Sequence, residues 1–254
     1  MKFVLSGSLI LFTLWVLYEV VTFPNISQLR STNPQTTSLI ETRTEEAGAA
    51  GEQGHAFKKI QIWVQLADIS INLQRAVLAG EDANFTTHHG FDYDAIRKAW
   101  EQGQREAEKE SRKEGDSDPL DFIPSLSNFR AGASTITQQL AKNLYLSSER
   151  SWTRKAREAV ITYFLERKLT KKRILELYLN VIEWGDGIYG AEAASEYYFK
   201  KPAANLTASE AAFLVAIIPN PRTVFNPALH SKRVARRQSA ILRGMASVKL
   251  TNLL

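Results

Sequence analysis

The second half of the chain carries one helix-start signal after another, with no alternating pattern of strands between them. The capping box that begins a helix, a threonine followed three residues later by glutamine or glutamate, occurs at Thr135–Gln138 and Thr207–Glu210. Other side chains that can cap a helix stand at Ser151 or Thr153 and at Thr170. The predicted helices run from Ile71, from Thr135 through Leu146, from Ser151 or Thr153 to Leu169, from Thr170 to Asn180, from Ala191, from Thr207 to Pro219 and from Lys232 to Met245. This pattern predicts a mainly α domain.

The first residues form a nearly unbroken apolar run. Residues 3–23 are long enough for one tilted helix across a bilayer, which needs about 20 residues. Trp15 and Tyr18 suit the membrane interface, and Glu19 falls near one end. Because the run ends in bulky residues, with no small-residue cleavage site, we expect a retained anchor rather than a removed signal peptide. The single run predicts a single-pass protein of the plasma (inner) membrane, and Lys2 with the amino terminus favours a domain on the periplasmic, extracytoplasmic side.

The composition along the chain divides it into three parts. Residues 1–23 are the transmembrane anchor, residues 24–60 an extracytoplasmic linker, and residues 61–254 the folded domain. The linker is rich in Thr, Ser, Glu and Gly and is expected to be a tether, in which residues 36–43 can form a short strand. Residues 101–121 are almost wholly polar, so they form either an exposed helical extension or a mobile loop.

The charge balance and the absence of cysteine limit the chemistry. Lys and Arg outnumber Asp and Glu by 32 to 27, a net charge of +5. This balance suggests an anionic partner without identifying its class. The lack of cysteine excludes disulfides, thiolate zinc sites and cysteine nucleophiles.

Glu81 interrupts the apolar face of the helix that begins at Ile71. The stripe predicted to be buried comprises Leu73, Ala76, Val77 and Gly80. At about 100° per residue, Glu81 lies about 40° from Val77 and therefore falls on this stripe. A carboxylate there needs a partner, and burial raises its pKa toward the range useful for proton transfer. The alternative is a carboxylate at the helix end that reaches water.

The segment from Gly132 to Asn143, GASTITQQLAKN, is a candidate anion site. A glycine before a capped helix start directs free backbone N–H groups outward. Gln138 and Lys142 are four residues apart and share a helix face, so both can reach one ligand. The alternative is an ordinary capped helix without a ligand.

Four cations flank one carboxylate, Glu158, in the next predicted helix. They are Arg150, Arg154, Lys155 and Arg157. Glu158 is about 200° from the expected apolar face and should lie with the charges; that face comprises Ala156, Val160, Tyr163 and Phe164. Such a cluster suits a diphosphate. The alternative is a surface ion pair between Arg154 and Glu158, worth about 0.3–0.5 kcal/mol.

Five segments, in this order and spacing, resemble the peptidoglycan glycosyltransferases of glycosyltransferase family 51. They are EDANFTTHHG (81–90), GASTITQQLAKN (132–143), RKAREAV (154–160), KKRILELYLN (171–180) and RRQSAIL (236–242). The resemblance covers about Val64 to Met245 and includes IPNPRTVFNP (218–227). No transpeptidase domain follows, so the chain is similar to a monofunctional enzyme and to the N-terminal domain of bifunctional penicillin-binding proteins. It departs from the family in the long polar stretch 101–121 and in Lys200, where glycine is common.

The resemblance implies a lysozyme-like, mainly α fold with a smaller membrane-proximal lobe. It also implies that lipid II, a disaccharide-pentapeptide on undecaprenyl diphosphate, supplies an acceptor 4-hydroxyl to the growing glycan strand. A β-1,4 linkage then forms with inversion, and undecaprenyl diphosphate leaves. The other expected partners are membrane lipids and further cell-wall synthesis or division proteins; nucleic acid is not expected.

The same resemblance assigns roles to residues of this sequence. Glu81 matches the general base. Glu158 matches the second essential carboxylate, which either holds a divalent cation (Mg²⁺ or Mn²⁺) on the diphosphate or orients the nearby cations. Glu176 is expected to be a structural carboxylate, and His88 to shape the acceptor pocket. The residues expected to bind substrate are Asp82, Phe85, His88, Ser134, Thr135, Gln138, Lys142, Asn143, Arg150, Arg154, Lys155 and Arg157.

Two other functions remain open at this stage. One is a lytic transglycosylase or muramidase on a similar fold, and the other is a non-catalytic, membrane-anchored cell-wall protein. A lytic enzyme needs an acidic carboxyl group but no cationic site for a diphosphate, so the cations between Lys142 and Arg157 disfavour it. The presence of both Glu81 and Glu158 disfavours a non-catalytic protein.

Overall fold

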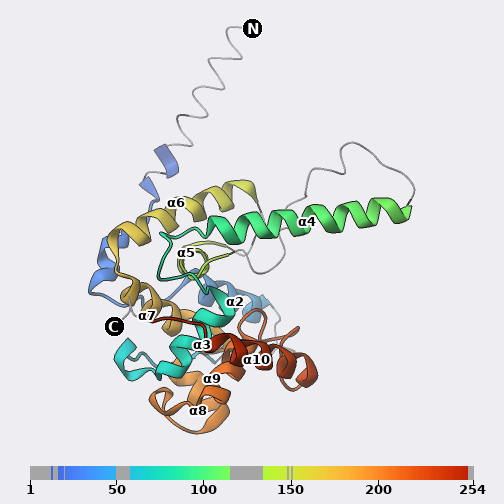
Figure 1. Ribbon diagram of the computed structural model, residues 1–254. Helices are drawn as coiled ribbons and strands as arrows, with labels where there is room; N and C mark the ends of the chain where they lie inside the picture. Colours follow the sequence, from blue (N-terminus) through green and yellow to red (C-terminus); the bar gives the residue numbers. More distant parts are fainter. Residues whose placement is uncertain are drawn as a thin grey trace.

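The domain is mainly helical, as the sequence predicts, with one small sheet (Figure 1). The computed structural model describes residues 13, 17–19, 21–49, 58–114, 134–147, 149 and 151–250. In chain order the elements are η1 (Ile26–Arg30), α2 (Ser38–Ala49), β1 (Ile60–Gln61), η3 (Leu66–Asp68), α3 (Ile71–Glu81), α4 (Tyr93–Glu114), α5 (Ile136–Tyr145), α6 (Trp152–Lys168), α7 (Lys171–Val181), β2 (Glu183–Gly185), β3 (Ile188–Tyr189), α8 (Ala191–Phe199), η5 (Ala203–Asn205), α9 (Ala208–Ile217) and α10 (Ser231–Met245).

The predicted anchor, residues 1–23, lies for the most part outside the described residues. Across the part of the chain that the structure describes, no helix combines the length and the apolar character needed to cross a membrane. Glu19 and residues 21–23 are described, and they lead into η1.

The predicted helix starts are confirmed by their hydrogen bonds. Both capping boxes form: the Thr135 hydroxyl accepts from the Gln138 N–H, and the Thr207 hydroxyl accepts from the Glu210 N–H. Ser151, rather than Thr153, caps α6. Lys200 ends α8 in the left-handed conformation with φ 57°, a position that favours glycine, and this explains why lysine is unusual there.

The end of α3 is packed between two later helices. α3, α9 and α10 contact one another (Figure 1). A Cβ atom on Gly80 would lie 2.6 Å from Val215 Cγ1 on α9 and 3.2 Å from Ile241 Cγ1 on α10. Glycine therefore suits this close approach, and a larger residue would require Val215 or Ile241 to shift. The adjacent residue, Glu81, is thereby placed against α10.

α5 lies against α6 and α7, and the small sheet follows α7 (Figure 1). The strand order is β1-β3-β2, with β1 parallel and β2 antiparallel to β3. Gly190, at φ 83°, begins α8, and a Cβ atom there would lie 2.9 Å from the Asn180 carbonyl oxygen. The predicted break before Ala191 is therefore a tight turn against the end of α7.

The segment predicted to be a tether instead packs onto the domain. Ile26, Leu29 and Ile40 are buried. Residues 36–43 do not form a strand; they begin α2, where the Ile40 N–H donates to the Thr37 hydroxyl at 3.2 Å. Three large apolar residues are enough for this docking, and an average over a polar segment conceals them.

The structure describes the first part of the polar stretch 101–121. α4 has 22 residues and projects from the body of the domain (Figure 1). Residues 101–114 are therefore a helical extension, which agrees with the helical alternative of the two predicted. Residues 115–121 lie outside the described residues.

Candidate active site

Glu81 ends α3 with 9% of its side chain exposed. Its Oε1 accepts from Arg237 Nη2 at 2.6 Å, and its Oε2 accepts from Gln139 Nε2 at 3.0 Å. Burial raises the pKa of the Glu81 carboxyl group, whereas Arg237 and Gln139 oppose that rise. The prediction that Glu81 lies in a buried setting with partners is confirmed, and both of its oxygens are held.

Gln139 connects Glu81 to the core. The Tyr178 hydroxyl on α7 donates to Gln139 Oε1 at 2.9 Å, so the amide NH₂ faces Glu81. Tyr178 is fully buried, and burial together with the nearby Glu81 charge raises its pKa well above the usual value. Tyr178 therefore donates its proton and fixes the orientation of the amide.

The sequence interpretation missed Gln139, Tyr178 and Arg237. Gln139 follows Gln138 in the sequence. Gln138 caps the helix, whereas Gln139 faces Glu81, and only the packing of α5 in the fold shows which glutamine does which. Arg237 was among the basic residues near the C-terminus that no motif linked to Glu81, 156 residues away. One feature of the sequence did point to such residues: a carboxylate at the buried position predicted for Glu81 requires a hydrogen-bonding or cationic partner.

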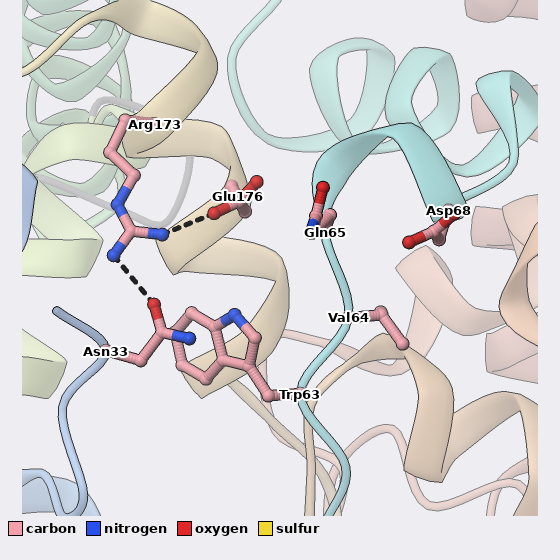
Figure 2. Close-up of a pocket in the computed structure, with 7 residues that line it drawn as sticks. All are labelled: Asn33, Trp63, Val64, Gln65, Asp68, Arg173 and Glu176. Carbon is pink, nitrogen blue, oxygen red and sulfur yellow. Dashed lines mark hydrogen bonds and ion pairs between the residues drawn. The ribbon is translucent and has the colours of Figure 1, made fainter. Parts of the chain in front are cut away.

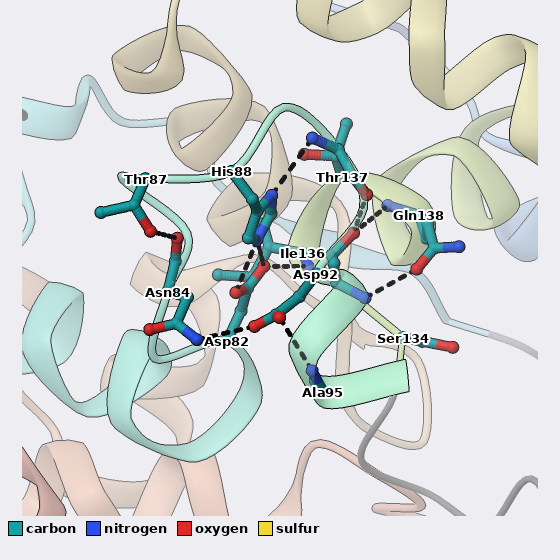
Figure 3. Close-up of polar contacts among 12 residues, drawn as sticks. Asp82, Asn84, Thr87, His88, Asp92, Ala95, Ser134, Ile136, Thr137 and Gln138 are labelled. Carbon is teal, nitrogen blue, oxygen red and sulfur yellow. Dashed lines mark hydrogen bonds and ion pairs between the residues drawn. The ribbon is translucent and has the colours of Figure 1, made fainter. Parts of the chain in front are cut away.

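Asp82 ties the loop after α3 to the start of α5 (Figure 3). Its carboxylate accepts from the Ile136 N–H at 3.0 Å and from His88 Nε2 at 2.9 Å. The Gly90 N–H donates to His88 Nδ1 at 3.1 Å, so the ring carries its proton on Nε2. Asp82 and His88 thus shape the loop through residue 90.

The start of α5 is not the open anion site that the sequence suggested. One of its N–H groups, that of Ile136, is taken by Asp82, and another, that of Gln138, by the Thr135 hydroxyl. That hydroxyl also donates to the Gly90 carbonyl at 2.7 Å. These contacts agree with the alternative prediction for this segment, an ordinary capped helix. The Asp82 carboxylate occupies the N-terminal end of α5, where an anion would otherwise bind.

The other candidates on these elements differ in exposure. Gln138 is buried, and its Oε1 accepts from the Thr135 N–H (Figure 3). On the same helix, Lys142 is exposed and Asn143 is half-buried; Ser134, before the helix, is exposed. Phe85 has no exposed area and lies 4.4 Å from Lys171 Nζ, so in this structure it packs within the fold.

Glu158 is buried, contrary to the expectation that it lies with exposed charges. Only 4% of its side chain is exposed, and it shares the inner face of α6 with Ile161, Thr162 and Leu165. The predicted apolar face is buried only in part: Phe164 packs against the core, whereas Val160 and Tyr163 are 48% and 52% exposed. α6 carries apolar residues on two faces, and tertiary packing selects the one that includes Glu158.

Two of the four predicted cations bind Glu158. Arg154 Nη1 lies 3.1 Å from Glu158 Oε2, and Lys155 Nζ contacts Oε1. Arg157 turns away and donates to the Thr22 carbonyl oxygen at 2.9 Å. Arg150 lies outside the described residues.

The donor set at Glu158 does not fit a metal site formed by the protein. Its carboxylate oxygens face two cations, Arg154 and Lys155. Within the described ranges, no group of three His, Asp or Glu side chains has an arrangement that could hold a metal ion. The predicted role of Glu158 as a ligand for Mg²⁺ or Mn²⁺ is therefore not supported by its neighbours.

A separate polar cavity of about 550 Å³ lies between residues 63–68 and α7, with Asn33 at its edge (Figure 2). Glu176 lines it, pairs with Arg173, and accepts from the Leu66 N–H at 2.9 Å. Glu176 is therefore a structural carboxylate, as expected. The lining residues are Asn33, Trp63, Val64, Gln65, Asp68, Arg173 and Glu176, and none belongs to the predicted substrate-binding set.

A mainly helical domain that holds Glu81 and Glu158 in buried settings beside cations has the chemistry of an enzyme acting on a polar, anionic substrate. The Transglycosylase family model matches residues 50–117 and 123–246. The chain belongs to this transglycosylase family, as the sequence motifs predict.

Relatives named biosynthetic peptidoglycan transglycosylase match almost the whole chain. The protein of Laribacter hongkongensis is 38% identical over 250 residues, covering 98% of this chain and 99% of its own length. The protein of an Azoarcus species is 42% identical over 233 residues, covering 90% and 91%. The protein of Bordetella pertussis is 45% identical over 207 residues, covering 82% and 78%.

Proposed function

We propose that this chain polymerises peptidoglycan glycan strands from lipid II at the outer face of the plasma membrane. Family membership and the names of the relatives support the reaction class. The observation that carries the mechanism is the buried Glu81 carboxylate, held by Arg237 and Gln139. The fold expected from the family resemblance is lysozyme-like with a smaller membrane-proximal lobe.

Glu81 is the general base of the proposed reaction. Its carboxylate takes the proton from the acceptor 4-hydroxyl as that oxygen bonds to the anomeric carbon of the donor strand. The bond from that carbon to the lipid diphosphate breaks on the opposite side, so the configuration inverts. Arg237 and Gln139 each hold one carboxylate oxygen, and each oxygen keeps a lone pair for the incoming proton. Burial supports this role because it increases the affinity of Glu81 for a proton.

Positive side chains stabilise the departing undecaprenyl diphosphate. Arg154 and Lys155 are oriented by Glu158, and Lys142 is exposed on α5. The negative charge that develops on the leaving group is stabilised by cations already held in position. Glu158 thus orients these cations and does not act as a base.

Side-chain cations, rather than a divalent metal ion, neutralise the diphosphate in this proposal. The two ion pairs of Glu158 support this view. Polymerisation should therefore persist after exhaustive chelation. Loss of activity on chelation, with recovery on adding Mg²⁺ or Mn²⁺, would instead assign the neutralisation to a cation carried by the substrate.

The domain works at a membrane surface in this proposal, with residues 1–23 as a single-pass anchor. Support comes from exposed apolar side chains on α6 and on the residues that precede η1. They are Leu17, Tyr18, Val21, Trp152, Val160 and Tyr163. Large apolar side chains exposed in this number on neighbouring elements are typical of a surface that contacts lipid. Membrane lipids are therefore proposed partners, as are other cell-wall synthesis or division proteins.

Supplying the purified full-length protein with lipid II, and separately with preformed glycan, tests the function. Growth of strands from lipid II, abolished by Glu81→Gln, is the expected result. The matched control is Glu101→Gln, because Glu101 is exposed on α4 and should leave the rate unchanged. Release of fragments from preformed glycan would identify a lytic enzyme, and inactivity on both would identify a non-catalytic protein.

A further inference from the structure

The residues before α2 are fastened along α6, the helix that carries Glu158. We call Glu19 together with residues 21–33 the N-terminal arm. The first part of the arm contacts Arg157 on α6. Arg157 Nη2 donates to the Thr22 carbonyl oxygen at 2.9 Å and to the Thr22 hydroxyl at 3.2 Å. Arg157 Nη1 lies 3.0 Å from Glu19 Oε2. Both terminal nitrogens of this guanidinium are therefore engaged by the arm.

The arm then follows α6 toward its C-terminal end. The ring of Phe23 packs edge-on against Phe164, with centroids 5.1 Å apart. Ile26 and Leu29 are buried in the core of the domain. Arg30 Nε donates to the Lys168 carbonyl oxygen at 2.7 Å. The contacts therefore run from the first turns of α6 to its last residue.

A second arginine holds the end of the arm against α7. Arg173 donates to the Leu29 carbonyl oxygen at 2.7 Å, to the Thr32 carbonyl oxygen at 3.1 Å and to Asn33 Oδ1 at 2.7 Å. Figure 2 shows this side chain between Asn33 and Glu176. Because Arg157 and Arg173 bind both ends of the arm, its position relative to α6 is fixed.

We propose that Arg157 is a positioning residue that locks α6 to the N-terminal arm, and that it does not bind the diphosphate. This inference rests on the proposed function, because it concerns the placement of the proposed leaving-group site. Successive helical residues point about 100° apart, so Arg157 and Glu158 face different directions. Arg154 and Lys155 reach Glu158, whereas Arg157 reaches Glu19 and Thr22.

The length of α6 gives this contact its importance. With 17 residues, the helix is about 25 Å long, and a tilt of about 10° about its far end would move its first turns by about 4 Å. A displacement of about 1 Å can lower turnover by roughly 100-fold. The diphosphate of a lipid-linked substrate lies at a depth set by the bilayer. A fixed link between the chain nearest the bilayer and the helix of Glu158 therefore sets the height of the site.

The test compares two substrates with the full-length protein in lipid vesicles. One substrate is lipid II in the same bilayer, and the other is a short-chain, water-soluble lipid II. Arg157→Gln should lower kcat/KM on bilayer lipid II by at least about tenfold and leave the soluble substrate nearly unchanged, because only the former has a fixed depth. Glu19→Gln should act in the same direction with a smaller loss, since the Thr22 contacts remain.

A double-mutant cycle identifies the partner of Arg157. The double variant Glu19→Gln, Arg157→Gln should be no worse than Arg157→Gln alone, because Arg157→Gln already breaks the ion pair that Glu19→Gln removes. Arg167→Gln is the matched control: it removes the same charge from an exposed position of the same helix and should leave both rates unchanged. Arg154→Gln, next to Glu158, should lower the rate on both substrates.

Three outcomes separate this inference from the proposed function. If Arg157→Gln lowers kcat/KM equally on both substrates, or if the losses in the double-mutant cycle are additive, Arg157 binds the diphosphate and the inference is wrong. If Arg157→Gln does not fold, Glu19→Gln carries the test, and a loss that does not depend on the substrate overturns the inference in the same way. A wild-type protein that polymerises neither substrate would instead refute the proposed function.

Discussion

Arg237→Gln tests whether the ion pair at Glu81 keeps the base ionised. The guanidinium lies 2.6 Å from the carboxylate, and the two side chains are 28% and 9% exposed. Glutamine removes the positive charge and retains a donor. Since burial already raises the pKa of Glu81, loss of Arg237 should raise it further.

The size of the effect follows from the burial of the pair. Removing one partner of a buried ion pair costs about 3–5 kcal/mol. Arg237 keeps some contact with solvent, and Gln139 still donates to Glu81 at 3.0 Å. We therefore expect the ionised carboxylate to lose about 2 kcal/mol of stabilisation, which lowers kcat/KM by up to about 30-fold at pH values below the pKa of Glu81.

The assay is the initial rate of glycan polymerisation between about pH 5 and pH 9, because the pH dependence of kcat/KM reports the base of the free enzyme. In Arg237→Gln the acidic limb should move to higher pH, and much of the rate should return at alkaline pH. Arg236→Gln is the matched control, because Arg236 is exposed on the same helix. An unshifted limb in Arg237→Gln, or an equal shift in Arg236→Gln, would refute the assignment.

Three other substitutions test the charges and the packing around the site. Burial raises the pKa of Glu81, so the ionised form of this carboxyl group opposes folding. Glu81→Gln should therefore have a higher melting temperature than the wild type at about pH 8 and the same melting temperature near pH 4. A lower melting temperature for Glu81→Gln at about pH 8 would contradict this. Gly80→Ala brings a Cβ to within 2.6 Å of Val215 Cγ1 and should lower the free energy of unfolding by about 1–3 kcal/mol in urea; an unchanged midpoint would show that α9 yields easily. Arg43→Met leaves the buried Glu183 carboxylate without its cation and should lower the free energy of unfolding, measured in urea, by about 2 kcal/mol. This loss should become smaller at acidic pH, where Glu183 is protonated. A loss that does not depend on pH would indicate a packing effect instead.

Local signals predicted the helices of this domain well. The boxes at Thr135 and Thr207 and the cap at Thr170 each satisfy N–H groups within a few residues, so sequence alone contains both partners. The inward direction of Glu81 was also predictable, because it follows from the spacing along α3.

Contacts between distant segments were not predictable in this way. The face of α6 that packs inward depends on helices elsewhere in the chain, so a pattern with apolar residues on two faces left Glu158 misplaced. The partner of Arg157 lies 135 residues earlier, in the apolar run that the sequence assigned to the transmembrane anchor. Arg237 likewise meets Glu81 only because α10 packs against α3.

The two carboxylates proposed for the reaction, Glu81 and Glu158, differ in the charge around them, and this difference fits the proposed division of the reaction. Glu158 with Arg154 and Lys155 is one negative against two positive charges, a net charge of +1. Glu81 with Arg237 is one against one, a net charge of zero. A net positive group stabilises a leaving diphosphate as its charge grows, whereas a neutral pair does not attract that anion. A carboxylate in a neutral pair thus stays available for the acceptor hydroxyl, which is what a general base beside an anionic substrate requires.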